Sequence, residues 1–171
     1  SGGGGIYTFN LAHGLATLYP GLDIVVLAGT SDNTIVKLEE HLLPNLTILR
    51  YRDFHLIDER KVHIWNIVQI LNDVISSYLP DIVHTHHIYE SFAGVLCKQI
   101  LKFRLVLSIQ KSPVAEFTEW KNDPQWSLIR FLFEKGEYEH IIANSKAYAG
   151  MAKFFGSKSP ISTIYYGVKN N

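Results

Sequence analysis

Three histidines and a glutamate occur close together in the segment DIVHTHHIYESFAG. His84 and His86 are two residues apart at the end of a predicted strand, so both side chains point to one face and His87 points to the other. Glu90 opens the helix that follows. This set predicts polar side chains that line a ligand cleft. A zinc site is the alternative, but zinc needs a further convergent ligand and supporting outer groups, so no metal is expected.

Two more strand ends carry polar side chains. Gln110, Lys111 and Ser112 follow the apolar run RLVLSI, and Asn144 and Ser145 follow HIIA. The loop after Ser112 mixes aromatic and acidic residues, a combination that suits the faces and hydroxyls of sugars. The alternative for these aromatic residues is that they cover the core. Asn144 or Ser145 is expected first to cap the next helix and second to contact a ligand.

Four consecutive glycines precede an amphipathic pattern at the start of the chain. A glycine loop that leads into a helix exposes backbone N–H groups to an anion, so Gly3, Gly4 and Gly5 are candidates for binding a diphosphate. A flexible leader is the alternative, because a glycine run has no fixed spacing. The spacing G-x-G-x-x-G of nicotinamide-binding domains is not met, which disfavours a nicotinamide or flavin domain.

The elements that must position these residues alternate along the chain. Short apolar runs typical of buried parallel strands alternate with helical periodicity. The predicted strands are 23–29, 45–51, 81–86, 104–110, 140–144 and 161–166, and the predicted helices are 6–18, 62–78, 91–101, 126–138 and 147–155. This order predicts an α/β fold with a Rossmann-like, doubly wound, mostly parallel sheet and helices on both faces. Ligands of such folds bind beyond the carboxyl ends of the strands.

Composition narrows the class of protein. The 171 residues carry 16 basic and 16 acidic side chains, which predicts no affinity for nucleic acid. The single Cys97 cannot form an internal disulfide. Neither a membrane-length apolar run nor a secretory signal is evident. Together these features predict a cytoplasmic protein.

The motifs, in this order, resemble a known family. The chain resembles the N-terminal half of a retaining glycosyltransferase of the two-domain GT-B fold. The motifs that carry this resemblance are, in order, the glycine segment with NLAHGLATLYPGLDIVVL, then PDIVHTHHIYESFAGVL, RLVLSIQ, EHIIANSKA and ISTIYYGVKN. The closest resemblance is to the group of glycogen synthases, sucrose synthases and mannosyl- or glucosyltransferases. It implies an N-terminal domain that binds the acceptor and a C-terminal Rossmann-like domain that binds a nucleotide-diphosphate sugar.

The resemblance also assigns residues. The glycines match the loop that approaches the donor diphosphate, His84 and His86 match a strand-end H-x-H, and Asn144 and Ser145 match a strand-end polar pair. Tyr-Gly-Val at 166–168 matches the Asn-Gly-Val before the second domain. His84 and the residue after RLVLSI are candidate catalytic groups. His86, His87, Glu90, Lys111, Ser112, Asn144 and Ser145 are candidate substrate-binding groups.

Two features depart from the family pattern. Members often have a histidine where this chain has Gln110, and an amide cannot supply a cationic imidazole. The strand that precedes the glycine loop in the family is absent. We therefore expect residues 1–171 to be a single domain excised from a larger enzyme, without its first strand or its donor domain. Such a piece is expected to be inactive alone, and its exposed sheet edge could self-associate.

The resemblance implies sugar transfer with retained anomeric configuration, without a cofactor or an obligatory metal. The nucleotide sugar is a co-substrate, and the acceptor is a saccharide or a lipid. The alternative is a non-catalytic, Rossmann-like module that binds a saccharide or a nucleotide, with Gln110 marking a lost activity.

Overall fold

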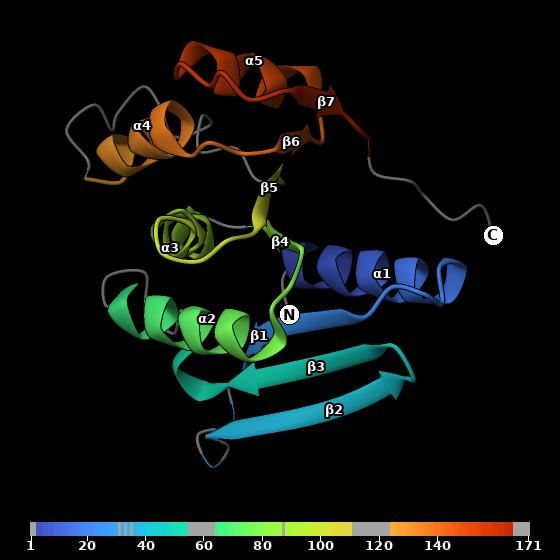
Figure 1. Cartoon of the computed structure of the whole chain (residues 1–171). Coiled ribbons are helices and arrows are strands. Elements are labelled where there is room, and N and C mark those ends of the chain that lie inside the picture. Colours follow the sequence, from blue (N-terminus) through green and yellow to red (C-terminus); the bar gives the residue numbers. More distant parts are fainter. Residues whose placement is uncertain are drawn as a thin grey trace. The chain divides into compact units, whose positions relative to one another are not determined.

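Residues 3–30, 32, 34, 36–54, 64–86, 88–110 and 124–165 are described by a computed structural model (Figure 1). Helices and strands alternate as expected, so the predicted α/β, Rossmann-like class is confirmed. The chain divides into two compact units between Ile70 and Leu71, inside helix α2 (Ile64–Tyr78). The described strands belong to two sheets, where the sequence analysis expected one.

The first unit contains helix α1 (Gly3–Leu18) and a three-stranded sheet. Strand β3 (Leu46–Tyr51) lies in the middle of the sheet, parallel to β1 (Ile24–Gly29) and antiparallel to β2 (Lys37–Leu43). The short 3-10 helix η1 (Arg52–Phe54) follows β3. The sequence predicted β1 and β3 but not β2, whose charged residues give no apolar run.

Helix α1 starts three residues earlier than its sequence pattern suggested. Gly3, Gly4 and Gly5 form its first turn and are not a loop. The first four N–H groups of any helix lack partners within the helix, so these glycines still offer backbone donors. At the other end, Asn45 Nδ2 donates to the carbonyl oxygens of Ala16 (3.1 Å) and Leu22 (2.9 Å). This amide therefore holds the end of α1 against the start of β3.

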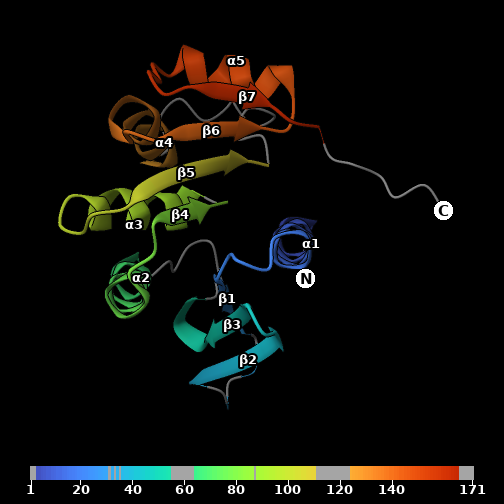
Figure 2. The same cartoon turned by 45° about the vertical axis from the view of Figure 1, so that its right-hand side comes forward.

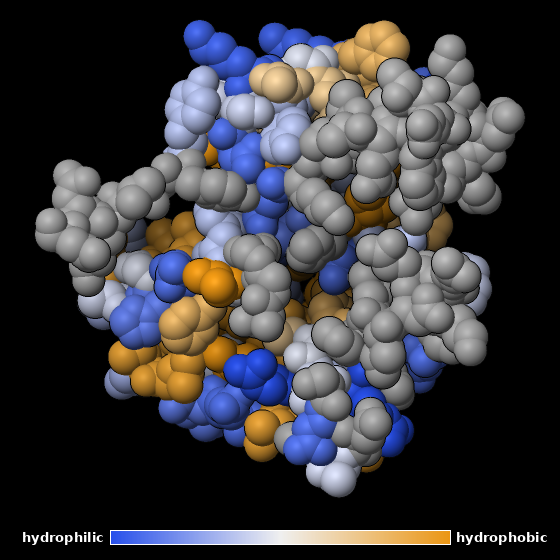
Figure 3. Space-filling model, turned by 180° about the vertical axis from the view of Figure 1, so that it is seen from behind, coloured by the Kyte–Doolittle hydropathy of each residue, from blue (hydrophilic) through white to orange (hydrophobic). Residues whose placement is uncertain are grey.

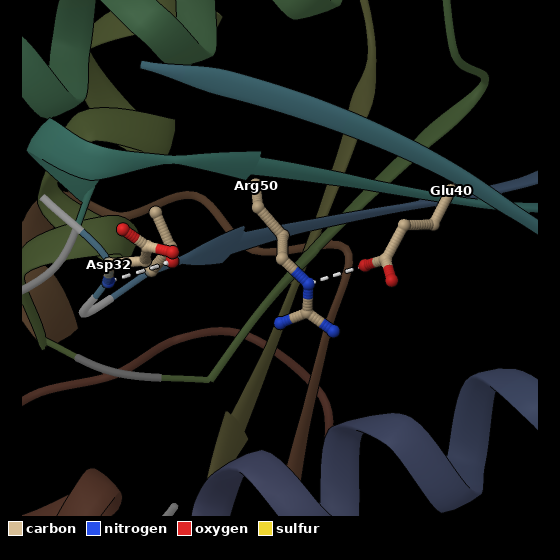
Figure 4. Close-up of polar contacts among 4 residues, drawn as sticks. Asp32, Glu40 and Arg50 are labelled. Atoms are coloured by element: carbon tan, nitrogen blue, oxygen red, sulfur yellow. Dashed lines mark hydrogen bonds and ion pairs between the residues drawn. The ribbon is translucent and has the colours of Figure 1, made fainter. Parts of the chain in front are cut away.

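An ion pair joins the two antiparallel strands of this unit. Arg50 Nε on β3 lies 2.5 Å from Glu40 Oε2 on β2 (Figure 4). Asp32, which follows β1, accepts hydrogen bonds from Thr34 Oγ1 (2.6 Å) and Thr34 N (2.9 Å). These bonds, chiefly that from the Thr34 hydroxyl, lower the pKa of Asp32. The Asp32–Thr34 bonds are exposed, whereas the Arg50–Glu40 pair is part-buried and links β2 to β3.

The second unit contains a sheet of four parallel strands in the order of the sequence (Figure 2). The strands are β4 (Ile82–Thr85), β5 (Arg104–Ile109), β6 (His140–Ala143) and β7 (Ile161–Thr163). Helices connect them: α3 (Ile88–Lys98), α4 (Pro124–Lys135) and α5 (Lys146–Phe154). Helices α3 and α4 pack against each other, and α5 packs on β6 and β7.

The core of the second unit lies between this sheet and its helices. Leu105 of β5 and Ile141 of β6 are fully buried. Gly94 lets α3 approach the sheet closely, because a Cβ atom there would meet Leu105 Cδ1 at 3.1 Å and Thr85 Cγ2 at 3.3 Å. The apolar side chains of α4 and α5 complete the same cluster.

Helix α2 buries one apolar stripe, as its sequence period predicts. Ile67, Leu71 and Ile75 recur every four residues and are all buried. None of the helices among the described residues has the length and apolar character to cross a membrane.

Some apolar side chains remain exposed on the first unit. They include Leu18, Leu22 and Leu42. Figure 3 shows the molecule from behind, and hydrophobic residues, coloured orange, gather at its lower left. Leu18 and Leu22 also line a shallow apolar hollow where α1 ends. The self-association expected from the sequence stays a prediction.

Candidate functional site

The carboxyl ends of the parallel strands bring the polar residues of the second unit to one edge of the sheet. Thr85, the last residue of β4, pairs with Leu107 of β5, and Ala143, the last residue of β6, pairs with Ile109 of β5. The residues that follow these strands are His86, Gln110 and Asn144. Parallel pairing therefore collects an imidazole and two amides at a single edge.

The two candidate histidines lie together. The ring centroids of His84 and His86 are 4.3 Å apart, with an angle of 35° between the planes. This contact confirms the prediction that His84 and His86, two residues apart at the end of the strand, point to the same side. His84 Nε2 also lies 2.8 Å from Ser108 Oγ on the neighbouring strand. Burial lowers the pKa of His84 to about 4, so its imidazole is uncharged at neutral pH.

The side chain of Gln110 joins this pair. Gln110 Nε2 lies 2.7 Å from Nδ1 of His86. The residue thus reaches from the end of β5 to the end of β4 and contacts the imidazole on its Nδ1 edge.

Asn144 extends the cluster to a third strand. Its Nδ2 donates to the backbone oxygen of Gln110 at 3.1 Å, and its backbone N–H donates to the oxygen of Ile109 at 3.3 Å. Asn144 Oδ1 is buried and has no hydrogen-bond partner among the described residues. A buried acceptor without a partner is costly, so this oxygen is suited to a hydroxyl or amide donor from a ligand.

Two buried hydroxyl groups, those of Thr85 and Ser91, hydrogen-bond to each other beside the site. Ser91 Oγ in α3 donates to Thr85 Oγ1 at 3.0 Å, and Thr85 Oγ1 donates to the oxygen of Val106 at 3.3 Å. Ser91 is fully buried. This chain of bonds ties α3 and the end of β4 to the middle of β5, and Thr85 directly precedes His86.

The other candidate residues are placed as follows. Ser145 is the N-cap of α5 and accepts from the Tyr148 N–H at 3.3 Å, which confirms the capping role expected from the sequence. Glu90 lies half-buried in the first turn of α3. Gly3, Gly4 and Gly5 belong to the first unit, in the first turn of α1. His87, Lys111, Ser112 and the segment 166–168 lie outside the described residues.

Ser108 is a residue of this cluster that the sequence did not lead us to expect. It is only 2% exposed and is the partner of His84. The signal was available, because Ser108 interrupts an otherwise apolar strand, RLVLSI. A buried hydroxyl in such a strand needs a partner, and the strand-end histidines were the nearest candidates in the predicted sheet.

The amides of Gln110 and Asn144 and the hydroxyl of Ser108 are uncharged, and His84 is uncharged at neutral pH. Within the ranges that the structure describes, no group of three or more histidine, cysteine or carboxylate side chains could hold a metal ion. Imidazole nitrogens, amides and a hydroxyl suit a ligand rich in hydroxyl groups.

Solved structures with a similar fold include sucrose-phosphate synthase from Thermosynechococcus elongatus. One chain of that protein matches with a TM-score of 0.73 and 16% identity over 96% of this chain and 86% of its own length. A second chain matches with a TM-score of 0.78 and 18% identity, over 98% of this chain but only 43% of its own length. These similarities support the Rossmann-like fold. The present chain spans less than half of that second protein chain.

No curated protein sequence matches this chain significantly. The sequence model of Glycosyltransferase Family 4 matches residues 1–170, which is nearly the whole chain. The resemblance noted from its strand-end motifs is thereby confirmed at the level of the family. The chain belongs to Glycosyltransferase Family 4.

Proposed function

We propose that this chain is the N-terminal, acceptor-side domain of a GT-B glycosyltransferase. The enzyme transfers a sugar from a nucleotide-diphosphate sugar to an acceptor hydroxyl and retains the anomeric configuration. The observation that carries this proposal is the convergence of His86, Gln110 and Asn144 at the carboxyl edge of a parallel sheet in a chain of this family. Ligands of α/β sheets bind at this edge.

The strand-end cluster binds the reacting sugar or the acceptor by hydrogen bonds. Asn144 Oδ1 accepts from a substrate hydroxyl, which removes the cost of an unpaired buried acceptor. Gln110 and His86 orient the substrate. His84, uncharged at neutral pH, stacks on His86 and does not act as a cation. These contacts contribute positioning, which lowers the entropic barrier to transfer.

The donor diphosphate is the leaving group, and stabilising its charge is the main electrostatic task. The backbone N–H groups of Gly3, Gly4 and Gly5 in the first turn of α1 can donate to its oxygens. A second Rossmann-like domain of the enzyme supplies the remaining basic and acidic groups. The reaction needs no metal or cofactor in this proposal, because the nucleotide sugar itself is the co-substrate.

The acceptor is a saccharide or a lipid hydroxyl, and the donor sugar is a hexose. Within the family, we place the chain near the glycogen synthase, sucrose synthase and mannosyltransferase group. Reduced, buried Cys97 is consistent with a cytoplasmic enzyme.

A mass-spectrometric screen of nucleotide sugars tests this function on the full-length gene product. Wild type is compared with Gln110→His, which restores the residue common in the family. Transfer or donor hydrolysis by wild type would support the proposal and show that an amide is sufficient. Activity only in Gln110→His would favour the alternative, a saccharide- or nucleotide-binding module. If neither protein transfers or hydrolyses any of the common nucleotide sugars, the proposed function is contradicted.

A further inference from the structure

The side chain of Gln110 meets the His86 ring at its Nδ1 atom. We propose that Gln110 is a positioning residue whose amide N–H holds His86 as the neutral Nε2–H tautomer. The strand end then presents an uncharged hydrogen-bond donor to the ligand.

The two atoms in contact determine which ring nitrogen of His86 carries the proton. Gln110 Nε2 is an amide nitrogen, which can only donate, and it lies 2.7 Å from His86 Nδ1. Nδ1 must therefore be the acceptor and carry no proton. A neutral imidazole has one N–H, so in this arrangement the proton is on Nε2. Protonation of Nδ1 would set two donors against each other at hydrogen-bond distance.

Neighbouring contacts keep both partners in place. Asn144 Nδ2 donates to the backbone oxygen of Gln110, which fixes the residue from which the amide extends. The ring of His84 packs on the ring of His86 at 4.3 Å. His84 is itself held by Ser108 Oγ at 2.8 Å. The orientation of the His86 ring is thus set from β4, β5 and β6 together.

This role gives the glutamine a function in a position where a histidine is common in the family. A histidine there could carry a positive charge, whereas Gln110 passes its effect on through His86. In the reaction, which rests on the proposed function, His86 Nε2–H donates to an oxygen of the bound sugar or acceptor. Gln110 itself is not a catalytic residue in this scheme.

The test is a direct reading of the His86 tautomer. Long-range ¹H–¹⁵N spectra of the full-length gene product, with ¹⁵N in its histidine rings, distinguish a protonated from an unprotonated ring nitrogen. The signals that disappear in His86→Gln are assigned to His86. We expect the Nε2–H form to exceed the Nδ1–H form by roughly tenfold, the ratio that one net hydrogen bond supports. A dominant Nδ1–H signal in wild type would overturn the proposal without any variant.

Two variants test whether Gln110 is the cause. In Gln110→Glu the ionised carboxylate can only accept, so His86 Nδ1 should carry a proton, in the Nδ1–H tautomer or in the imidazolium. Gln110→Met removes the hydrogen bond and should give a mixture of tautomers. Gln99→Glu makes the same change at an exposed residue after α3, and its His86 signals should be the same as those of wild type. An unchanged His86 signal in Gln110→Glu would also overturn the proposal.

The tautomer spectra of wild type and of the variants need no substrate. Failure of the proposed function would appear as silence in the donor screen, while failure of the tautomer proposal would appear in the spectra. If the enzyme is active, Gln110→Met should lower kcat more than it raises KM for the acceptor, because the donor on His86 is no longer fixed.

Discussion

His84 Nε2 and Ser108 Oγ lie 2.8 Å apart, and this contact joins β4 to β5 beneath the strand-end cluster. Ser108 is almost fully buried, and His84 is half-buried and uncharged at neutral pH. The pair is therefore part of the sheet's interior as much as of the candidate site. Protonation of His84 and removal of the Ser108 hydroxyl should therefore both lower the free energy of unfolding.

The free energy of unfolding should fall as the pH is lowered through the titration of His84. Its pKa is about 4 in the folded state and 6.5 in the unfolded state, so the unfolded chain binds more protons between these values. The stabilisation is complete above pH 6.5 and decreases as the pH falls towards 4. The expected change is roughly 2–3 kcal/mol. Urea unfolding at several pH values measures it.

The control for this experiment is a histidine without burial. His84→Gln should flatten the pH dependence in this window, whereas His13→Gln, at an exposed position of α1, should not. Equal pH profiles for wild type and His84→Gln would contradict the assignment of the shift to His84.

Ser108→Ala should destabilise the protein because it leaves the imidazole of His84 without its partner. The expected cost is about 1–3 kcal/mol, the range for an unpaired buried polar group. Ser162→Ala is a matched control, since Ser162 Oγ contacts His140 Nε2 at 2.9 Å in the same way but at a less buried place. Thermal or urea unfolding should rank Ser108→Ala as the more costly change. The reverse ranking would show that the His84 contact contributes little.

Two helical glycines should respond oppositely to a larger side chain. A Cβ atom at Gly150 meets nothing within 4 Å, so Gly150→Ala should stabilise α5 by up to about 1 kcal/mol. At Gly94 the Cβ position is already within 3.1 Å of Leu105, so Gly94→Val should destabilise by about 1–3 kcal/mol. Denaturant unfolding of both variants measures the difference. A stable Gly94→Val variant would mean that α3 can move away from the sheet.

Cys97 should react slowly with thiol reagents. It is 2% exposed, and burial raises its pKa to about 11, so little reactive thiolate is present at neutral pH. Labelling should become fast only after unfolding in urea. Ser127→Cys, on the exposed side of α4, provides the reactive comparison in the folded protein. Equal labelling rates at both positions under native conditions would contradict the buried placement of Cys97.

The sequence predicted the buried strands well and the charged edge strand not at all. Runs such as RLVLSIQ mark β5 within one residue, because a strand covered on both faces must be apolar throughout. Strand β2, KLEEHLL, lies at the edge of its sheet and is largely exposed, so no apolar period reveals it. Charged residues are typical of such edges because they prevent pairing with other chains.

The candidate site was predicted by position but not by contacts. Strand-end placement identified His86, Gln110 and Asn144, since parallel strands end at one edge of the sheet. Which atoms meet could not be predicted, because Gln110 Nε2 reaches His86 through a register that only the pairing of β4 with β5 sets. The start of α1 was missed for a different reason. Glycine is a poor helix former, and the sequence alone gave no cause to extend the helix to Gly3.

The most direct test of the proposed site is the rate of sugar transfer by the full-length gene product with Asn144→Leu, once the screen has identified a donor. The change removes the buried Oδ1 acceptor and the bond to Gln110, while Gln99→Leu makes a comparable change at an exposed residue. If the strand-end cluster binds the reacting groups, Asn144→Leu should lower kcat/KM by about 10-fold or more, with wild-type circular dichroism, and Gln99→Leu should match wild type. Equal transfer rates for folded Asn144→Leu and wild type would contradict the placement of the site at this edge of the sheet.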